Sequence, residues 1–157
     1  MLKFKTNTFK FIVIFSVLIT ISSCSDTYRD YQKVNDMQWY RTDVKTFELD
    51  IPKDGNYDLY FAMRHSSGYP FRNIGVKIEQ ITPEGNELSQ EVDLSVVNEK
   101  DEYKGEVIGM LWDIEDVFSE NTPLKKGKYT FKISHIMNSD PVILVIDIGL
   151  KIRKAGS

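Results

Sequence analysis

Cysteine and histidine are scarce in this sequence, which holds one cysteine and two histidines among 157 residues. A single cysteine excludes a disulfide within the chain. The two histidines, His65 and His135, are far apart, and no zinc-ligand spacing such as CxxC or HExxH is present. The GxSxG nucleophile elbow and the GxxxxGKS/T phosphate loop are also absent from the sequence. We therefore expect no metal, no cofactor, no small-molecule substrate and no enzymatic activity.

The sequence also lacks an apolar run long enough to cross a bilayer. Its most apolar segment, from Phe11 to Ile21, is shorter than the roughly 20 residues that a transmembrane helix needs. Lys3, Lys5 and Lys10 precede this segment without any acidic residue, and small residues follow it. A basic start, a short apolar stretch and small residues before a cleavage point are typical of a secretory signal peptide.

The end of this stretch matches the lipobox of bacterial lipoproteins. Ile21, Ser22 and Ser23 supply an aliphatic residue and two small residues directly before Cys24. In such proteins the cysteine sulfur is the nucleophile that accepts diacylglycerol, and the peptide before it is removed. We predict that Cys24 is lipidated with fatty acyl chains such as palmitate and attaches the protein to a membrane. The alternative is a small buried cysteine that packs like alanine.

Basic residues are fewer than acidic ones. The chain has 20 lysines and arginines against 23 acids, and the part before Cys24 removes three of the lysines, so the mature balance is 17 − 23 = −6. Proteins that bind nucleic acid present a basic patch, so we expect no nucleic-acid partner. Electrostatic adhesion to anionic lipid is equally disfavoured, which leaves the lipid on Cys24 as the membrane attachment.

We expect three segments: a lipoprotein signal peptide at 1–23, a tether and first loop at 24–43, and one folded domain at 44–157. In the folded part apolar and polar residues alternate in short runs separated by turn sequences, and no segment keeps a helical period over three turns. The pattern predicts an all-β fold, an antiparallel β-sandwich, with a small β-barrel as the alternative. The clearest runs are 47–51, 57–64, 74–79, 129–133 and 142–152, with weaker ones at 88–97 and 105–112 and a short helical turn expected within 113–121.

Three aromatic residues, Tyr69, Phe71 and Trp112, are the candidate contact residues for a partner or a glycan. Aromatic rings on a β-sandwich can stack on sugars or anchor a protein interface, and they can equally close the end of the core. Two other groups of side chains have simpler interpretations. His65 beside Ser66 and Ser67 is read as a plain turn, and the acidic run 113–116 is read as a solvated loop, with calcium binding as its alternative.

Four stretches of this sequence resemble one protein family. They are 57–64, of the form YxLYxxxR; 69–73, of the form YPxxN; 127–131, of the form GxYxF; and 147–154, of the form DxGLxxxK. In this order behind a lipobox they resemble the GldH gliding-motility lipoproteins of the Bacteroidetes. The resemblance covers roughly Trp39 to Lys154, which is most of the mature chain.

This resemblance implies a lipid-anchored protein of the cell envelope that supports gliding motility and the secretion machinery associated with it. It implies contacts with other envelope or gliding-machinery proteins and neither catalysis nor a cofactor. Asp26, just behind the cysteine, is compatible with placement at the outer membrane. The alternative function, from a different class, is a surface glycan-binding β-sandwich lipoprotein that uses the three aromatic residues.

Overall fold

A computed structural model describes residues 28–156 of the protein, and nearly all of its regular structure is β-strand. Cys24 lies outside the described residues. Among those residues no helix is long and apolar enough to span a membrane. In chain order the elements are β1 Tyr28–Lys33, the 3-10 helix η1 Asn35–Met37, β2 Gln38–Trp39, β3 Lys45–Ile51, β4 Gly55–Ser66, β5 Asn73–Ile81, β6 Glu87–Ser95, β7 Glu106–Ile108, β8 Leu111–Leu124, β9 Gly127–His135, β10 Val142–Ile143 and β11 Val145–Lys154.

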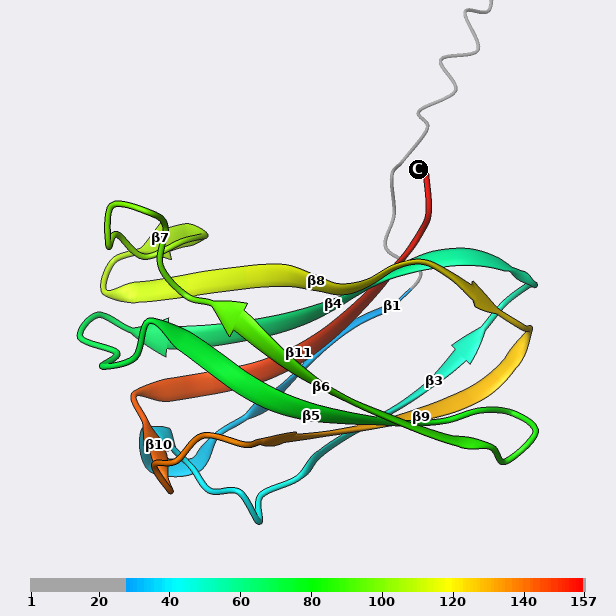
Figure 1. Cartoon of the computed structure of the whole chain (residues 1–157), viewed down its shortest axis with the longest axis horizontal. Coiled ribbons are helices and arrows are strands. Elements are labelled where there is room, and N and C mark those ends of the chain that lie inside the picture. The colour runs from blue at the N-terminus through cyan, green and yellow to red at the C-terminus, as the bar shows by residue number, and fades with distance from the viewer. Residues whose placement is uncertain (1–27, 157) are drawn as a thin grey trace, which may run out of the picture.

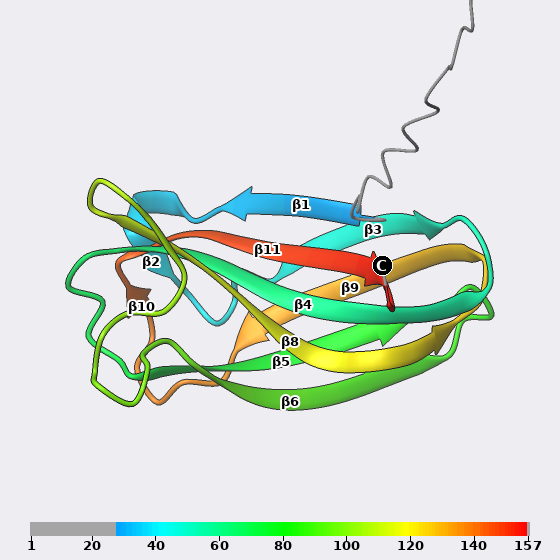
Figure 2. The same cartoon turned by 90° about the horizontal axis from the view of Figure 1, so that it is seen from above.

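The strands form two main sheets that face each other (Figure 1), one of five strands in the order β1-β11-β4-β8-β7 and one of four in the order β3-β9-β5-β6. A small third sheet pairs β10 with β2. Every ladder between named strands is antiparallel. The turned view separates the two layers (Figure 2), which do not close into a barrel. The predicted antiparallel β-sandwich is therefore confirmed and the barrel alternative is not.

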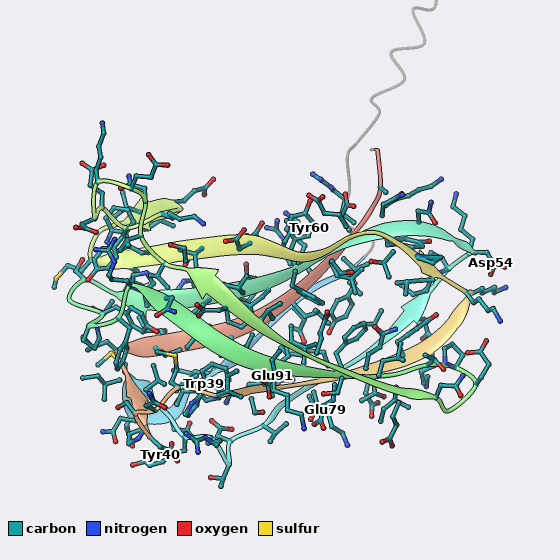
Figure 3. The ribbon with its side chains drawn as sticks, in the orientation of Figure 1. Trp39, Tyr40, Asp54, Tyr60, Glu79 and Glu91 are labelled. Carbon is teal, nitrogen blue, oxygen red and sulfur yellow. The ribbon has the colours of Figure 1, made fainter. Side chains whose placement is uncertain are left out.

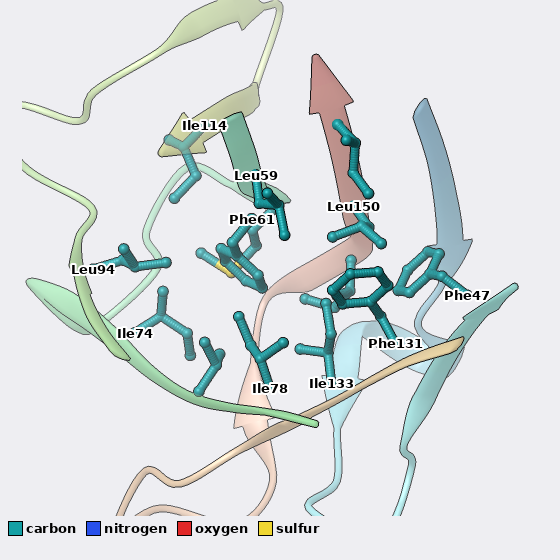
Figure 4. Close-up of a cluster of buried hydrophobic side chains, with 14 of the residues drawn as sticks. Phe47, Leu59, Phe61, Ile74, Ile78, Leu94, Ile114, Phe131, Ile133 and Leu150 are labelled. Atoms are coloured by element: carbon teal, nitrogen blue, oxygen red, sulfur yellow. The ribbon is translucent and has the colours of Figure 1, made fainter. Parts of the chain in front are cut away.

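The alternation of apolar and polar residues places one face of each central strand in the core. In β3 every second residue is buried, and Phe47 pairs in register with Phe131 of β9. In β4 the odd-numbered positions from Tyr57 to His65 are all buried. Side chains from both sheets, including Phe61, Ile78 and Phe131, interdigitate between the layers (Figure 4). Burying an aliphatic or phenylalanine side chain contributes about 1.5–3 kcal/mol, so this layer supplies most of the stability.

The segment expected to be a tether and first loop contains two strands. β1 pairs with β11 along its whole length, from Tyr28 opposite Ile152 to Lys33 opposite Asp147, so residues 28–33 belong to the sandwich. Trp39 in β2 is fully buried and its Nε1 donates to the carbonyl of Asp43 at 2.9 Å. The irregular hydrophobic pattern concealed these strands because β1 lies at the sheet edge, where its burial is only partial.

The short helical turn expected within 113–121 was also a wrong prediction. These residues lie inside β8, a strand of 14 residues that pairs with β4 from Ser66 opposite Leu111 to Gly55 opposite Leu124. Register shifts near Leu59 mark irregular pairing in this ladder. The strand accommodates these acidic residues because Arg64 of β4 and Lys151 of β11 form ion pairs with Asp113 and Glu115.

Candidate interaction site

The three aromatic residues singled out from the sequence lie at the same end of the sandwich. The ring centroids of Tyr69 and Phe71 are 5.6 Å apart in an edge-to-face arrangement. Trp112, on β8, is not next to either ring but reaches Tyr69 through two intermediate rings. Trp112 lies 5.4 Å from Tyr103, Tyr103 lies 4.9 Å from His65, and His65 lies 5.0 Å from Tyr69. We call these five residues the aromatic chain.

His65 is the centre of the aromatic chain, and its position follows from the strand pattern. It continues the inward-facing series of β4, so its imidazole points into the core and is fully buried. Period-two reasoning could have identified it as a core residue. Tyr103 gave no such signal, because it lies in the irregular segment between β6 and β7 and forms only an isolated bridge with Val97.

Hydrogen bonds hold the aromatic chain to the loop after β4. The hydroxyl of Tyr103 donates to the Tyr69 carbonyl at 2.9 Å and accepts from the Gly68 amide at 3.1 Å. Trp112 Nε1 donates to Ser67 Oγ at 3.3 Å. The rings therefore connect this loop to β8 through both packing and polar contacts. Aromatic pairs of this type add about 0.5–1.5 kcal/mol beyond the area that they bury.

Burial controls the ionisation of the aromatic chain. It lowers the pKa of His65, although the Ser66 carbonyl and the charge of Asp113 act in the opposite direction. His65 Nδ1 lies 3.1 Å from the Ser66 carbonyl oxygen, whereas its Nε2 has no hydrogen-bond partner. Burial likewise raises the pKa of Tyr69. A neutral imidazole with Nδ1 protonated satisfies this geometry.

The neighbouring serines are not arranged as nucleophiles with His65 as their base. The imidazole faces the backbone oxygen of Ser66 rather than a hydroxyl. The Ser67 hydroxyl donates instead to the Met110 carbonyl at 3.1 Å. Base and nucleophile must lie within hydrogen-bond reach for nucleophilic catalysis, and these two groups do not. His65 and Ser66 end strand β4 and the turn begins at Ser67, so the interpretation as a turn is wrong for His65 and Ser66.

The acidic run on β8 forms ion pairs on the outer face of the five-stranded sheet. Arg64 makes a two-point contact with Asp113, at 2.6 Å from Nε to Oδ1 and 2.7 Å from Nη2 to Oδ2, and reaches Asp147 at 3.2 Å. Glu115 pairs with Lys151 at 2.7 Å and with Arg29 at 3.1 Å. Within residues 28–156 no group of three or more possible metal ligands is present. The calcium alternative therefore finds no support in the part of the chain that the structure describes.

A shallow cavity of about 270 Å³ lies on this charged face, between Arg29 and Tyr31 on one side and Glu106 on the other. Tyr31 covers the central strand at Gly149, where a Cβ would lie 2.7 Å from the tyrosine ring. The Tyr31 hydroxyl donates to Glu115 at 3.2 Å, and burial together with the Glu115 charge raises its pKa to about 12. Asp113 and Glu115 at this cavity already pair with cations, whereas Glu106 forms no ion pair within residues 28–156.

Trp39 and Tyr40 mark a second aromatic position, beside the small β2–β10 sheet (Figure 3). The Trp39 ring packs edge-on against His135 with centroids 5.3 Å apart. His135 is fully buried, and its Nε2 lies 3.3 Å from Asp140 Oδ1. Burial lowers the pKa of His135, with Asp140 opposing the shift and Arg41 adding to it. This cluster fixes β2 onto the sandwich and leaves the Tyr40 side chain exposed.

Together the fold and these clusters define a small antiparallel β-sandwich with a closed apolar core. The sequence matches the family described as GldH lipoprotein over residues 26–152. The chain therefore belongs to the GldH lipoprotein family, as its sequence motifs predicted. Membership in a lipoprotein family indicates a membrane-anchored place in the cell envelope.

Other comparisons find only distant likenesses. No curated protein matches the sequence. Among solved structures, TmCBM61 in complex with beta-1,4-galactotriose is similar with a TM-score of 0.36 and 11% identity, over 83% of this chain and 91% of that one. The infectious bursal disease virus VP2 subviral particle is similar with a TM-score of 0.32 and 15% identity, over 85% of this chain and 32% of that one. Likeness at this level carries no information about a shared ligand.

Proposed function

We propose that this protein is a non-enzymatic, lipid-anchored component of the outer membrane that supports gliding motility and its associated secretion machinery through contacts with other envelope proteins. The observation that carries the proposal is the match to the GldH lipoprotein family over residues 26–152. The geometry is in accord with it. The described residues form a sandwich with a closed apolar core, which suits a scaffold for contacts better than a catalytic site.

The glycan-binding alternative gains less support. A sugar platform needs exposed rings that lie side by side, whereas Tyr69 is only 3% exposed. The neighbouring Phe71 and the more distant Trp112 are half-buried, and adjacent rings in the aromatic chain are inclined by 43° to 70°. These angles favour packing within the protein over a flat stacking surface.

Deletion of the gene in the source bacterium tests the motility role. If the bacterium glides, we expect the deletion strain to lose colony spreading and single-cell movement over surfaces, and an intact copy of the gene to restore both. Crosslinking followed by pull-down from intact envelopes should then identify the protein partners. Normal spreading of the deletion strain would contradict the motility role.

The lipid anchor is tested by Cys24→Ser. Without the thiol that accepts the lipid, the protein should remain as an uncut precursor or leave the membrane fraction. Palmitate labelling should be present in the wild-type protein and lost in the variant. Labelling that persists in Cys24→Ser would contradict the assignment of this cysteine.

A further inference from the structure

The hairpin of β7 and β8 carries an exposed apolar surface. Val107 is 53% exposed, Ile108 66% and Met110 69%. These three residues, which we call the apolar tip, surround a turn that Gly109 allows with a φ of +65°. Scattered exposed apolar residues are normal on soluble proteins, but three in succession on one projecting turn indicate a contact surface.

The apolar tip is held firmly in place. The Met110 carbonyl accepts hydrogen bonds from the Ser67 amide at 2.8 Å and from the Ser67 hydroxyl at 3.1 Å. Directly behind it, Trp112 pairs across the hairpin with Val107 and packs against Tyr103 of the aromatic chain. The aromatic chain thus connects the exposed tip to the core. A surface that is fixed before binding loses little conformational freedom in the complex, which favours affinity.

The segment that leads into the hairpin is acidic. Residues 98–106 contain four acids and two lysines, a balance of 2 − 4 = −2. Asp101 pairs with Arg72, and Lys104 pairs with Asp116 of β8. Within residues 28–156, Glu99 and Glu106 form no ion pair. Glu106 directly precedes the apolar tip, and this negative charge disfavours an anionic lipid surface and favours a partner with basic groups around an apolar pocket.

The position of the apolar tip relative to the lipid anchor also favours a protein partner. Tyr28 and Leu59 of β4 both pair with Ile152 of β11, so they lie at the same height along the sheet. In the hairpin of β7 and β8, β8 begins at Leu111, which pairs with Ser66 of β4. The seven residue-to-residue steps from Leu59 to Ser66 span about 23 Å along a strand. The chain from Cys24 to Tyr28 reaches at most about 14 Å. A lipid on Cys24 therefore holds the Tyr28 end near the membrane, while the tip lies at the far end of the sandwich (Figure 1).

We propose that the apolar tip is the docking surface for another envelope protein, whose apolar pocket is bordered by lysine or arginine side chains. This assignment rests on the proposed function and specifies where its protein contacts are made. Ile108 and Met110 insert into the pocket, and Glu106 faces its basic border. Removing an anchor residue of this kind from the centre of an interface weakens binding about tenfold or more.

Complementation of the deletion strain with full-length variants tests the assignment. Ile108→Asp combined with Met110→Asp should abolish spreading, whereas Leu88→Asp, at a comparably exposed apolar residue on β6, should restore it. Palmitate labelling and thermal unfolding show that each variant is anchored and folded. If the aspartate pair does not fold, Ile108→Ser combined with Met110→Ser replaces it. Full spreading with a folded tip variant would contradict the assignment of the docking surface. Loss of spreading with Leu88→Asp would contradict it as well.

Photo-crosslinking identifies the occupant. With benzoylphenylalanine in place of Ile108, the full-length protein in intact cells should give one adduct with a different protein, and Met110→Asp should reduce that adduct about tenfold. Leu88→Asp should leave the adduct unchanged. An adduct that contains only lipid, or only two copies of this chain, overturns the proposal. Failure of the motility role is distinguishable, because in that case the deletion strain itself spreads normally.

Discussion

Stability should fall on mild acidification because two histidines are buried in the neutral form. His65 and His135 are both fully buried, and burial is the largest cause that lowers the pKa of each. Their remaining neighbours do not reverse the shift. Asp113 and Asp140 raise the respective pKa values, whereas Arg41 lowers that of His135 further.

The direction of the effect follows from proton linkage. Below the unfolded-state pKa of about 6.5 the unfolded chain takes up protons that the folded chain does not, so the free energy of unfolding falls as the pH falls. Between about pH 7 and about pH 5.5 each histidine contributes a loss of up to about 1.3 kcal/mol, or about 2.5 kcal/mol for both. The full value is reached when the folded-state pKa lies well below the lower pH. Carboxylates with ordinary pKa values titrate mainly below this window.

Urea unfolding of residues 24–157, measured at both pH values, checks the prediction. His65→Phe and His135→Phe keep a ring in each position and remove the titrating group. Each single variant should lose about half of the pH dependence, and the double variant should unfold with nearly the same free energy at both pH values. An unchanged midpoint in the wild-type protein, or an unchanged pH dependence in the double variant, would refute the reasoning.

Three further changes test particular contacts through urea unfolding at neutral pH. Gly149→Ala should destabilise the domain by about 1–2 kcal/mol because a Cβ would lie 2.7 Å from the Tyr31 ring, and the loss should shrink in a Tyr31→Ala background. Arg64→Met should cost about 1 kcal/mol, since it removes the two-point contact with Asp113 from a partly exposed site, and a neutral result would show that solvent screens the pair fully. Trp39→Phe should cost about 1–3 kcal/mol through lost volume and a lost hydrogen bond, and an unchanged midpoint would contradict its role in holding β2.

The sandwich could be predicted wherever one face of a strand is buried and the other is wet. In β3 and β9 the alternation is regular, because Phe47 and Phe131 face the core and their sequence neighbours face water. β1 escaped detection because only part of its surface is buried and its stability comes from pairing with β11. That pairing brings together the two ends of the described chain, so a pattern within a short stretch of sequence does not predict it.

The acidic part of β8 was misread for a related reason. Clustered carboxylates are unfavourable in an isolated strand, so the sequence suggested a turn or a loop. In the fold, Asp113 and Glu115 lie beside Arg64 of β4 and Lys151 of β11, which compensate their charges. The same limit applies to the aromatic chain. The aromatic residues at 69, 71 and 112 were recognised in the sequence as candidate contact residues. Their connection through His65 and Tyr103 depends on the arrangement of the loops at the end of the sandwich.

The distribution of charge also indicates which surface is available to a partner. The outer face of the five-stranded sheet carries four cations and four carboxylates in mutual ion pairs, a balance of 4 − 4 = 0, namely Arg29, Arg64, Lys151 and Arg153 with Asp58, Asp113, Glu115 and Asp147. A charged partner would have to break these pairs and would gain little from this face. Glu106, opposite Asp113 and directly before the apolar tip, adds to the edge of this face a carboxylate that forms no ion pair within residues 28–156. Apolar surface and an unpaired carboxylate thus coincide at this end of the sandwich.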